Sequence, residues 1–116
     1  MKQTVSLKLN RDFRRLYQKG TSAVNPFLAV YCRKNRLGHN RLGLTVGTKV
    51  GHAVVRNRVR RRLRESYRLH EDRFRQGYDI VVVARARAAG ARYAQLETAL
   101  LRLARRLDLL REEETP

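Results

Sequence analysis

Residues 53–69 combine an apolar stripe with an arginine-rich face, and this segment constrains the fold more than any other part of the chain. An apolar residue recurs at every fourth position, at Val55, Val59, Leu63 and Tyr67. This spacing predicts a helix with one buried side. At about 100° per residue, the opposite side carries Asn57, Arg61, Arg64 and Arg68, and the flanks carry Arg56, Arg60 and Arg62, with Arg58 nearer the polar side. The chain must therefore bury one side of this helix and leave the other to a partner.

The charge on this helix is part of a wider imbalance. Seven arginines lie between positions 56 and 68, with only Glu65 to offset them. Like charges four residues apart repel by about 0.2–0.5 kcal/mol per pair in an isolated helix. The 116-residue chain has a net charge of +17, and residues 1–64 hold 17 basic side chains and a single acidic one, while residues 65–116 hold 10 basic and 9 acidic. So concentrated an excess predicts a docking face for a polyanion, and nucleic acid fits it best.

The first half of the chain reads as a helix followed by strands. Helical spacing predicts a helix over residues 10–19, with Asn10 as its N-cap and Gly20 just after its end. Two β-prone segments, 27–32 and 41–47, flank a loop rich in asparagine and are expected to pair as a hairpin.

Three further elements complete the predicted fold. A weak strand signal covers Thr21–Val24, and the apolar run Tyr78–Ala84 predicts a strand at the centre of a sheet. Leucines at helical spacing predict a long amphipathic helix near the C-terminus: Leu96, Leu100, Leu103, Leu107 and Leu110. The order α-β-β-β-α-β-α predicts an α/β sandwich, one sheet with helices packed on it, similar to small ribosomal proteins. With 42% apolar residues, we expect one domain over 1–116 with a frayed acidic tail at 112–116.

One face of this sheet suits nucleic acid better than a core. Alternate positions of the two strands carry small or aromatic residues: Phe27, Ala29 and Tyr31 in one strand and Gly43, Thr45 and Gly47 in the other. Small residues let a nucleic-acid strand approach the backbone, and aromatic rings stack its bases. Phe13 and Tyr17 lie one turn apart on the first helix, and either they belong to the core or they add two rings to this face. Which faces coincide depends on strand register, which the sequence leaves open.

No catalytic or metal-binding pattern stands out in the sequence. Cys32 is the single cysteine, and the three histidines are scattered. Asp12, Glu65 and Asp79 are well separated, and the stretch 47–51 lacks the P-loop pattern. The longest apolar runs are too short to cross a membrane, and a signal-peptide pattern is missing, so we expect a cytoplasmic protein.

The stretch from Lys49 to Glu65 closely resembles the hallmark of the bacterial ribonuclease P protein family, whose RNR motif corresponds to Arg56-Asn57-Arg58. The flanking segments that also resemble the family are Asn10–Phe13 with Tyr17, Gly20–Ser22, Arg41–Val46 and Tyr78–Arg85. Two positions depart from it: Thr48 stands where a second lysine is common, and Tyr17 stands where phenylalanine is frequent. The resemblance covers nearly the whole chain.

The resemblance implies a subunit of a ribozyme that removes the 5′ leader from precursor tRNA. In that family the RNA holds the catalytic Mg²⁺ ions and performs the hydrolysis, so neither a catalytic nor a metal-binding residue is expected in this chain. The residues that would dock on the catalytic RNA are Arg56, Asn57, Arg58, Arg60, Arg61, Arg62, Arg64 and Arg68. Those that would hold the single-stranded leader are Phe13, Tyr17, Tyr31, Thr45 and Lys49. The family also implies a left-handed crossover from strand 41–47 through the arginine helix to strand 78–84, against the usual right-handed rule.

Three other functions compete with this interpretation. A small ribosomal protein that holds ribosomal RNA fits the composition, size and fold class, and only the motif argues against it. An autonomous RNA hydrolase is disfavoured because the sequence shows no active site. A sequence-specific DNA binder is disfavoured because the sequence shows neither a helix-turn-helix nor a dimerisation heptad. We expect no DNA partner and no membrane partner.

Overall fold

A mixed five-stranded sheet forms the centre of the computed structural model, which describes residues 1–111. The tail predicted at 112–116 lies outside the described residues. The strands are β1 (Val5–Ser6), β2 (Thr21–Val24), β3 (Leu28–Lys34), β4 (Arg41–Thr45) and β5 (Tyr78–Ala84). They lie in the order β1-β4-β5-β3-β2, with β4 parallel to both β1 and β5, and β3 antiparallel to both β5 and β2.

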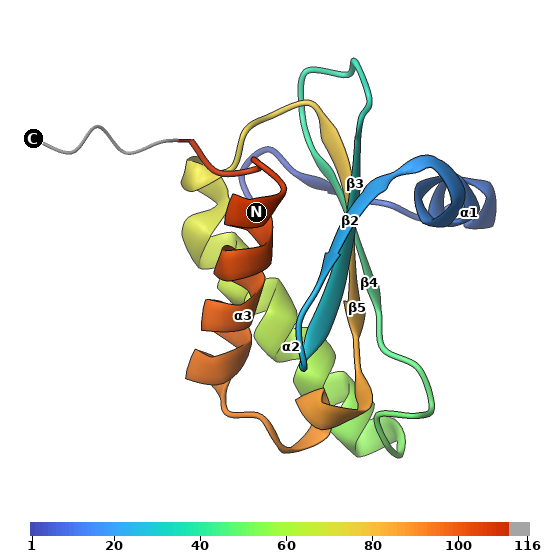
Figure 1. Cartoon of the computed structure of the whole chain (residues 1–116), viewed down its shortest axis with the longest axis vertical. Coiled ribbons are helices and arrows are strands. Elements are labelled where there is room, and N and C mark those ends of the chain that lie inside the picture. The colour runs from blue at the N-terminus through green and yellow to red at the C-terminus, as the bar shows by residue number, and fades with distance from the viewer. Residues whose placement is uncertain (112–116) are drawn as a thin grey trace, which may run out of the picture.

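Helices cover both faces of the sheet. They are α1 (Asn10–Lys19), α2 (Ala53–His70) and α3 (Tyr93–Arg106), with short 3-10 turns η1 (Glu71–Arg73) and η2 (Ala86–Gly90). Figure 1 shows α1 alone on one face and α2 with α3 on the other. The predicted α/β sandwich is therefore confirmed. Within residues 1–111, none of these helices combines the length and apolar character needed to cross a membrane.

The strand β5 lies at the centre of the sheet because both of its faces are apolar. Ile80 and Val82 belong to the larger core, which α2 and α3 cover. Val81 packs instead with Leu7 and Leu16 in a smaller core beneath α1. The prediction of a central strand at 78–84 is confirmed.

The predicted hairpin between 27–32 and 41–47 is wrong, since β5 lies between β3 and β4. The connecting loop therefore spans two strand spacings, about 10 Å, rather than closing a tight turn. Its two asparagines bind the loop to β5: the Asn35 amide donates to Asp79 at 2.9 Å, and Asn40 accepts from the Tyr78 backbone at 2.8 Å. The weakly predicted strand at 21–24 does form, and it is β2 that pairs with β3 as a hairpin.

The ends of α1 differ in detail from the prediction. The helix begins at Asn10 itself, with Leu9 as the N-cap and no side-chain capping bond, so Asn10 is not the cap. Gly20 has extended backbone (φ −75°) rather than the left-handed conformation common after a helix. It is required for space instead, because a methyl group at Gly20 would lie 2.6 Å from the Leu16 carbonyl oxygen.

The helix α3 is shorter than its leucine pattern predicts. It ends at Arg106, and Leu107 is its C-cap. The chain then turns at Asp108, whose φ of 57° is left-handed, and Leu110 forms a β-bridge with Phe74. Leu110 is therefore buried in the core although it lies beyond the end of the helix. The spacing of apolar residues predicts which side chains are buried, but it does not predict where the helical hydrogen bonds stop.

The order of elements gains one strand at its start, because β1 precedes α1 and pairs with β4. A buried carboxylate holds the segment before it. Glu71 is 4% exposed and accepts hydrogen bonds from the backbone amides of Lys2 (2.7 Å) and Thr4 (3.0 Å). The Thr4 hydroxyl bonds the Tyr67 hydroxyl at 2.7 Å. Burial raises the pKa of Glu71, but the hydrogen bonds from Thr4 and the amides outweigh it, so the pKa lies below the ordinary 4.5.

Replacing this carboxylate should remove a pH-dependent part of the stability. Because the folded pKa of Glu71 is lowered, its contribution is present above pH 4.5 and is lost as the pH falls through the folded pKa. We expect Glu71→Gln to lower the free energy of unfolding at pH 7, with the difference from wild type shrinking in acid. Urea unfolding across this pH range measures it. Asp72→Asn, at the neighbouring exposed position, is the control. A Glu71→Gln deficit that stays undiminished down to the lowest pH at which the wild type still folds would contradict the linkage.

Candidate nucleic-acid interface

The helix α2 divides into a buried stripe and a basic outer face, as its periodicity predicts. Val59, Leu63 and Tyr67 are at most 1% exposed, while Val55 is only partly buried. The predicted outer positions, all exposed, are Asn57, Arg61, Arg64 and Arg68. We call these four residues the outer face of α2.

The arginines of α2 differ in whether they form hydrogen bonds within the folded chain. Arg58 and Arg62 point back, donating to the carbonyl oxygens of Ala89 (3.5 Å) and Ala91 (2.8 Å), so they hold the η2 segment against α2. By contrast, Arg61 bears no hydrogen bond or ion pair within residues 1–111.

The remaining arginines of α2 also differ in their partners. Arg60 donates to the Asn57 side chain at 3.0 Å, and Arg68 donates to Glu65 through Nε at 3.0 Å. This bond lowers the pKa of the Glu65 carboxyl, which therefore stays ionised beside Arg68. Arg64, like Arg61, has no intramolecular partner in the described part of the chain, and the Nε–H of Arg56 is buried without an acceptor there. The fold thus leaves several guanidinium groups of α2 available to external anions.

A second candidate surface lies on the opposite face of the sheet, beneath α1. The rings of Tyr17 and Tyr31 meet edge to face at 5.0 Å, and the Tyr17 hydroxyl shares a 2.9 Å hydrogen bond with Thr45. Phe13 lies directly over Gly43, where an added methyl group would come within 2.6 Å of two ring carbons. Four of the five predicted leader-binding residues are therefore brought together, on a surface of rings over small residues that we call the aromatic surface.

Strand register explains why these residues share a face. Tyr31 and Gly43 both pair with Val81, one on each side of β5, and Ala29 and Thr45 both pair with Val83. The sequence correctly predicts which residues alternate in β3 and in β4. Only their common pairing with β5 places Tyr31 and Gly43 on the same face. Phe27 does not belong with them: it precedes β3 and packs against the larger core, on the side of α3.

Lys49, the fifth predicted leader-binding residue, lies outside the sheet and the helices. It is exposed in the turn that connects β4 to α2, and within residues 1–111 no hydrogen bond or ion pair joins it to the rings. Its place along the chain is between the aromatic surface and the outer face of α2.

Two carboxylates that are distant in the sequence meet at one arginine. Arg41 bonds Asp79 at 2.6 Å and reaches Asp12 at 3.5 Å, so these carboxylates are not separated as predicted. Burial raises the pKa of Asp79, but hydrogen bonds from Arg41 and Asn35 outweigh it and lower the pKa overall. The cluster is an ion-pair network that joins α1, β4 and β5. Sequence reasoning missed it because Arg41 and Asp79 become neighbours only through strand register.

Comparison with known proteins shows which family the chain belongs to. The Ribonuclease P family model matches residues 1–108 of the chain. The chain belongs to this family. The ribonuclease P protein component of Alkaliphilus metalliredigens is 46% identical over 110 residues, which cover 95% of this chain and 99% of that protein.

Solved structures of ribonuclease P proteins share the fold. The Staphylococcus aureus protein is 34% identical with a TM-score of 0.85, covering 91% of this chain and 97% of that one. The Thermotoga maritima protein is 33% identical with a TM-score of 0.79, covering 86% and 96%. Membership of the ribonuclease P family gives the chain a subunit role in tRNA 5′ processing.

The described residues of this ribonuclease P subunit offer no metal site of their own. Residues 1–111 contain no group of three or more His, Cys, Asp or Glu side chains that could hold a metal ion, and Asp12 and Asp79 both form ion pairs with Arg41. Cys32 is a core residue, and burial raises the pKa of its thiol to about 11, so it stays protonated at neutral pH. These side chains therefore do not fit a protein-held Mg²⁺ ion.

Proposed function

We propose that the two surfaces divide the RNA contacts of the holoenzyme. The outer face of α2, with its flanking arginines, docks on the catalytic RNA, and the aromatic surface holds the single-stranded 5′ leader of precursor tRNA. The observation that carries this proposal is that three rings gather on one face of the sheet: Phe13 lies over Gly43, and Tyr17 meets Tyr31 edge to face. Base–aromatic stacking stabilises single-stranded RNA by about 1–3 kcal/mol per base.

The chain's role under this proposal is binding and positioning. The Mg²⁺ ions that the hydrolysis needs are held by the RNA, and the protein acts in the cytoplasm with that RNA. Its contribution is to hold the leader on one face of the sheet while α2, on the other face, fixes the protein to the catalytic RNA. Guanidinium groups suit the second task because their planar forks match phosphate oxygens.

The crossover from β4 through α2 to β5 is part of the same proposal. We infer that it is left-handed, as the family resemblance implies, although about 98% of such connections between parallel strands are right-handed. The parallel, adjacent pairing of β4 and β5 makes the connection a true crossover. The kinship of this fold with small ribosomal proteins rests on the same topology. An experimental structure of this chain with a right-handed connection would contradict both.

Removing the two unpartnered arginines of the outer face should weaken assembly with the catalytic RNA. Each lost phosphate contact lowers the slope of log K against log salt by about 0.7–0.9, so Arg61→Gln with Arg64→Gln should lower it by about 1.4–1.8. Binding of the protein to the catalytic RNA over a salt series measures this. The control is Arg105→Gln with Arg111→Gln, which removes the same charge from exposed positions outside α2. Its slope should stay steeper than that of the Arg61→Gln, Arg64→Gln variant. Identical slopes for the two pairs would remove the case for docking through α2.

Reconstitution tests the function as a whole. We expect this protein to restore 5′-leader cleavage of precursor tRNA by a bacterial ribonuclease P RNA at low Mg²⁺, where the RNA alone is slow. The assay compares cleavage with and without protein. A failure to restore cleavage, together with tight binding to ribosomal RNA, would favour the ribosomal alternative. Cleavage by the protein without RNA would revive the autonomous hydrolase.

A further inference from the structure

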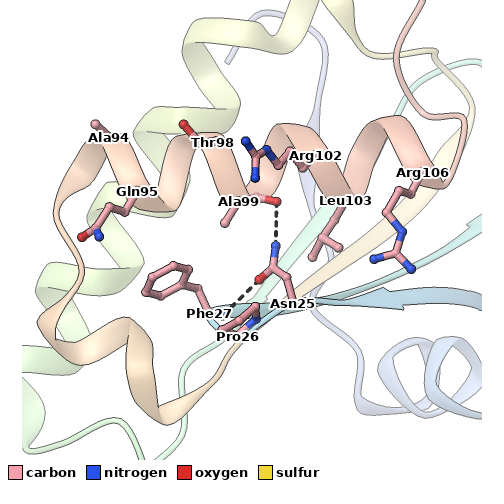
Figure 2. A pocket seen from close by; sticks show the side chains of 10 residues that line it. All are labelled: Asn25, Pro26, Phe27, Ala94, Gln95, Thr98, Ala99, Arg102, Leu103 and Arg106. Carbon is pink, nitrogen blue, oxygen red and sulfur yellow. Dashed lines mark hydrogen bonds between the residues drawn. The ribbon is translucent and has the colours of Figure 1, made fainter.

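A cavity of about 670 Å³ lies away from both surfaces described above, between the Asn25–Phe27 turn and one side of α3. Figure 2 shows side chains from the turn and from α3 facing each other across it. Its position is on the sheet face opposite the aromatic surface, because Phe27 packs with the larger core.

The rim of the cavity is basic. Arg102 and Arg106 lie one helical turn apart on α3, and within residues 1–111 no carboxylate lines the cavity. Arg102 has no hydrogen bond or ion pair within residues 1–111, and Arg106 makes only a 3.3 Å bond to the Val24 carbonyl oxygen in that part of the chain. Residues four apart on a helix have Cβ atoms about 5–6 Å apart. The rim therefore presents two guanidinium groups from successive turns of α3, and guanidinium groups are well suited to phosphate oxygens.

The floor of the cavity is apolar and held in place. Of its apolar lining residues, Phe27 is partly exposed and Leu103 is buried, and the guanidinium of Arg87 lies 5.7 Å from the centre of the Phe27 ring. Asn25 fixes the turn, since its amide donates to the Ala99 carbonyl at 3.1 Å and its side-chain oxygen accepts from the Phe27 amide at 3.0 Å. An occupant would meet a preformed cavity and would not have to order the turn.

We propose that this cavity seats one nucleotide of a single-stranded RNA segment, with its base against Phe27 and its phosphates on Arg102 and Arg106. An aromatic ring beside guanidinium groups is the combination that single-stranded nucleic acid uses. An acidic peptide would use the arginines but not the ring. The cavity is thus a third RNA contact, independent of the outer face of α2 and of the aromatic surface.

Amide NMR of the full chain can separate this contact from the proposed leader site. We would titrate ¹⁵N-labelled protein with a single-stranded adenosine tetranucleotide. Binding in the cavity shifts the amides of Phe27, Thr98 and Arg102, whereas binding at the aromatic surface shifts those of Phe13 and Thr45. Arg102→Gln and, separately, Phe27→Leu should each raise the dissociation constant at the cavity about fivefold or more. Arg105→Gln, a matched arginine on α3 that does not line the cavity, should leave it unchanged.

The outcomes bear separately on the two assignments. Saturable shifts at the cavity that respond to both variants support the proposal, whether or not the aromatic surface also responds. Shifts confined to the aromatic surface overturn it and leave the leader assignment standing. Shifts confined to the cavity support it and count against the leader assignment. Two results would overturn the choice of RNA as the occupant. One is that the cavity binds tetraglutamate as tightly as the tetranucleotide. The other is that Phe27→Leu, with a melting temperature equal to that of the wild type, leaves the dissociation constant at the cavity unchanged.

Discussion

Replacing Leu100 and Leu103 together by alanine should lower the free energy of unfolding by about 4–10 kcal/mol. Each leucine is 1% exposed on the side of α3 that covers the larger core, and a buried leucine truncated to alanine costs about 2–5 kcal/mol. Small domains are stable by only about 5–15 kcal/mol. The double variant should therefore be largely unfolded, which circular dichroism during urea unfolding will detect.

A surface leucine provides the control for that result. Leu69→Ala removes the same atoms from a position that is 55% exposed on α2, and its effect should stay within about 0.5 kcal/mol. A loss below about 2 kcal/mol for the double variant would mean that α3 does not close the larger core.

Phe13→Ala should weaken binding of precursor tRNA to the reconstituted holoenzyme by about five- to 150-fold and leave mature tRNA binding unchanged. The range corresponds to one lost base–aromatic stack. Only the precursor carries a leader, so a ring that contacts the leader affects one substrate alone. Dissociation constants for the two tRNAs, measured side by side, give the answer.

A second variant displaces the same ring without deleting it. Gly43→Ala places a methyl group 2.6 Å from two carbons of the Phe13 ring, which must then move, and it should reproduce the selective loss. Equal losses for precursor and mature tRNA with Phe13→Ala would mean that Phe13, packed against the smaller core, acts through folding.

Local patterns in the sequence predict the elements well. The four-residue spacing of Val55, Val59 and Leu63 places α2 and its exposed arginines correctly, because a helix face depends only on neighbours within the same segment. Strand alternation likewise separates Tyr31 from Cys32. The family motif adds the function, which periodicity alone leaves open among several RNA-binding classes.

Pairings between distant segments could not be predicted in the same way. The hairpin prediction fails because adjacency along the chain favours 27–32 beside 41–47, whereas burial of both faces of Tyr78–Ala84 requires that strand between them. The Arg41 network follows from that insertion, since Arg41 and Asp79 meet only once β5 is in place. Strand alternation places Phe27 on the wrong face, because the strand starts one residue later, at Leu28.

The late position of β5 in the sequence sets an order for synthesis of the protein. The strands β3 and β4 share no hydrogen bonds with each other, so a nascent chain that ends before Tyr78 can form the β2–β3 hairpin but not the sheet. Until β5 emerges from the ribosome, the most basic half of the molecule has no core on which α2 can settle. Long-range pairing of this kind slows folding. The arginine-rich segment of α2 is therefore synthesised before the strand that completes its core. During that interval, non-specific binding of other RNA competes with folding.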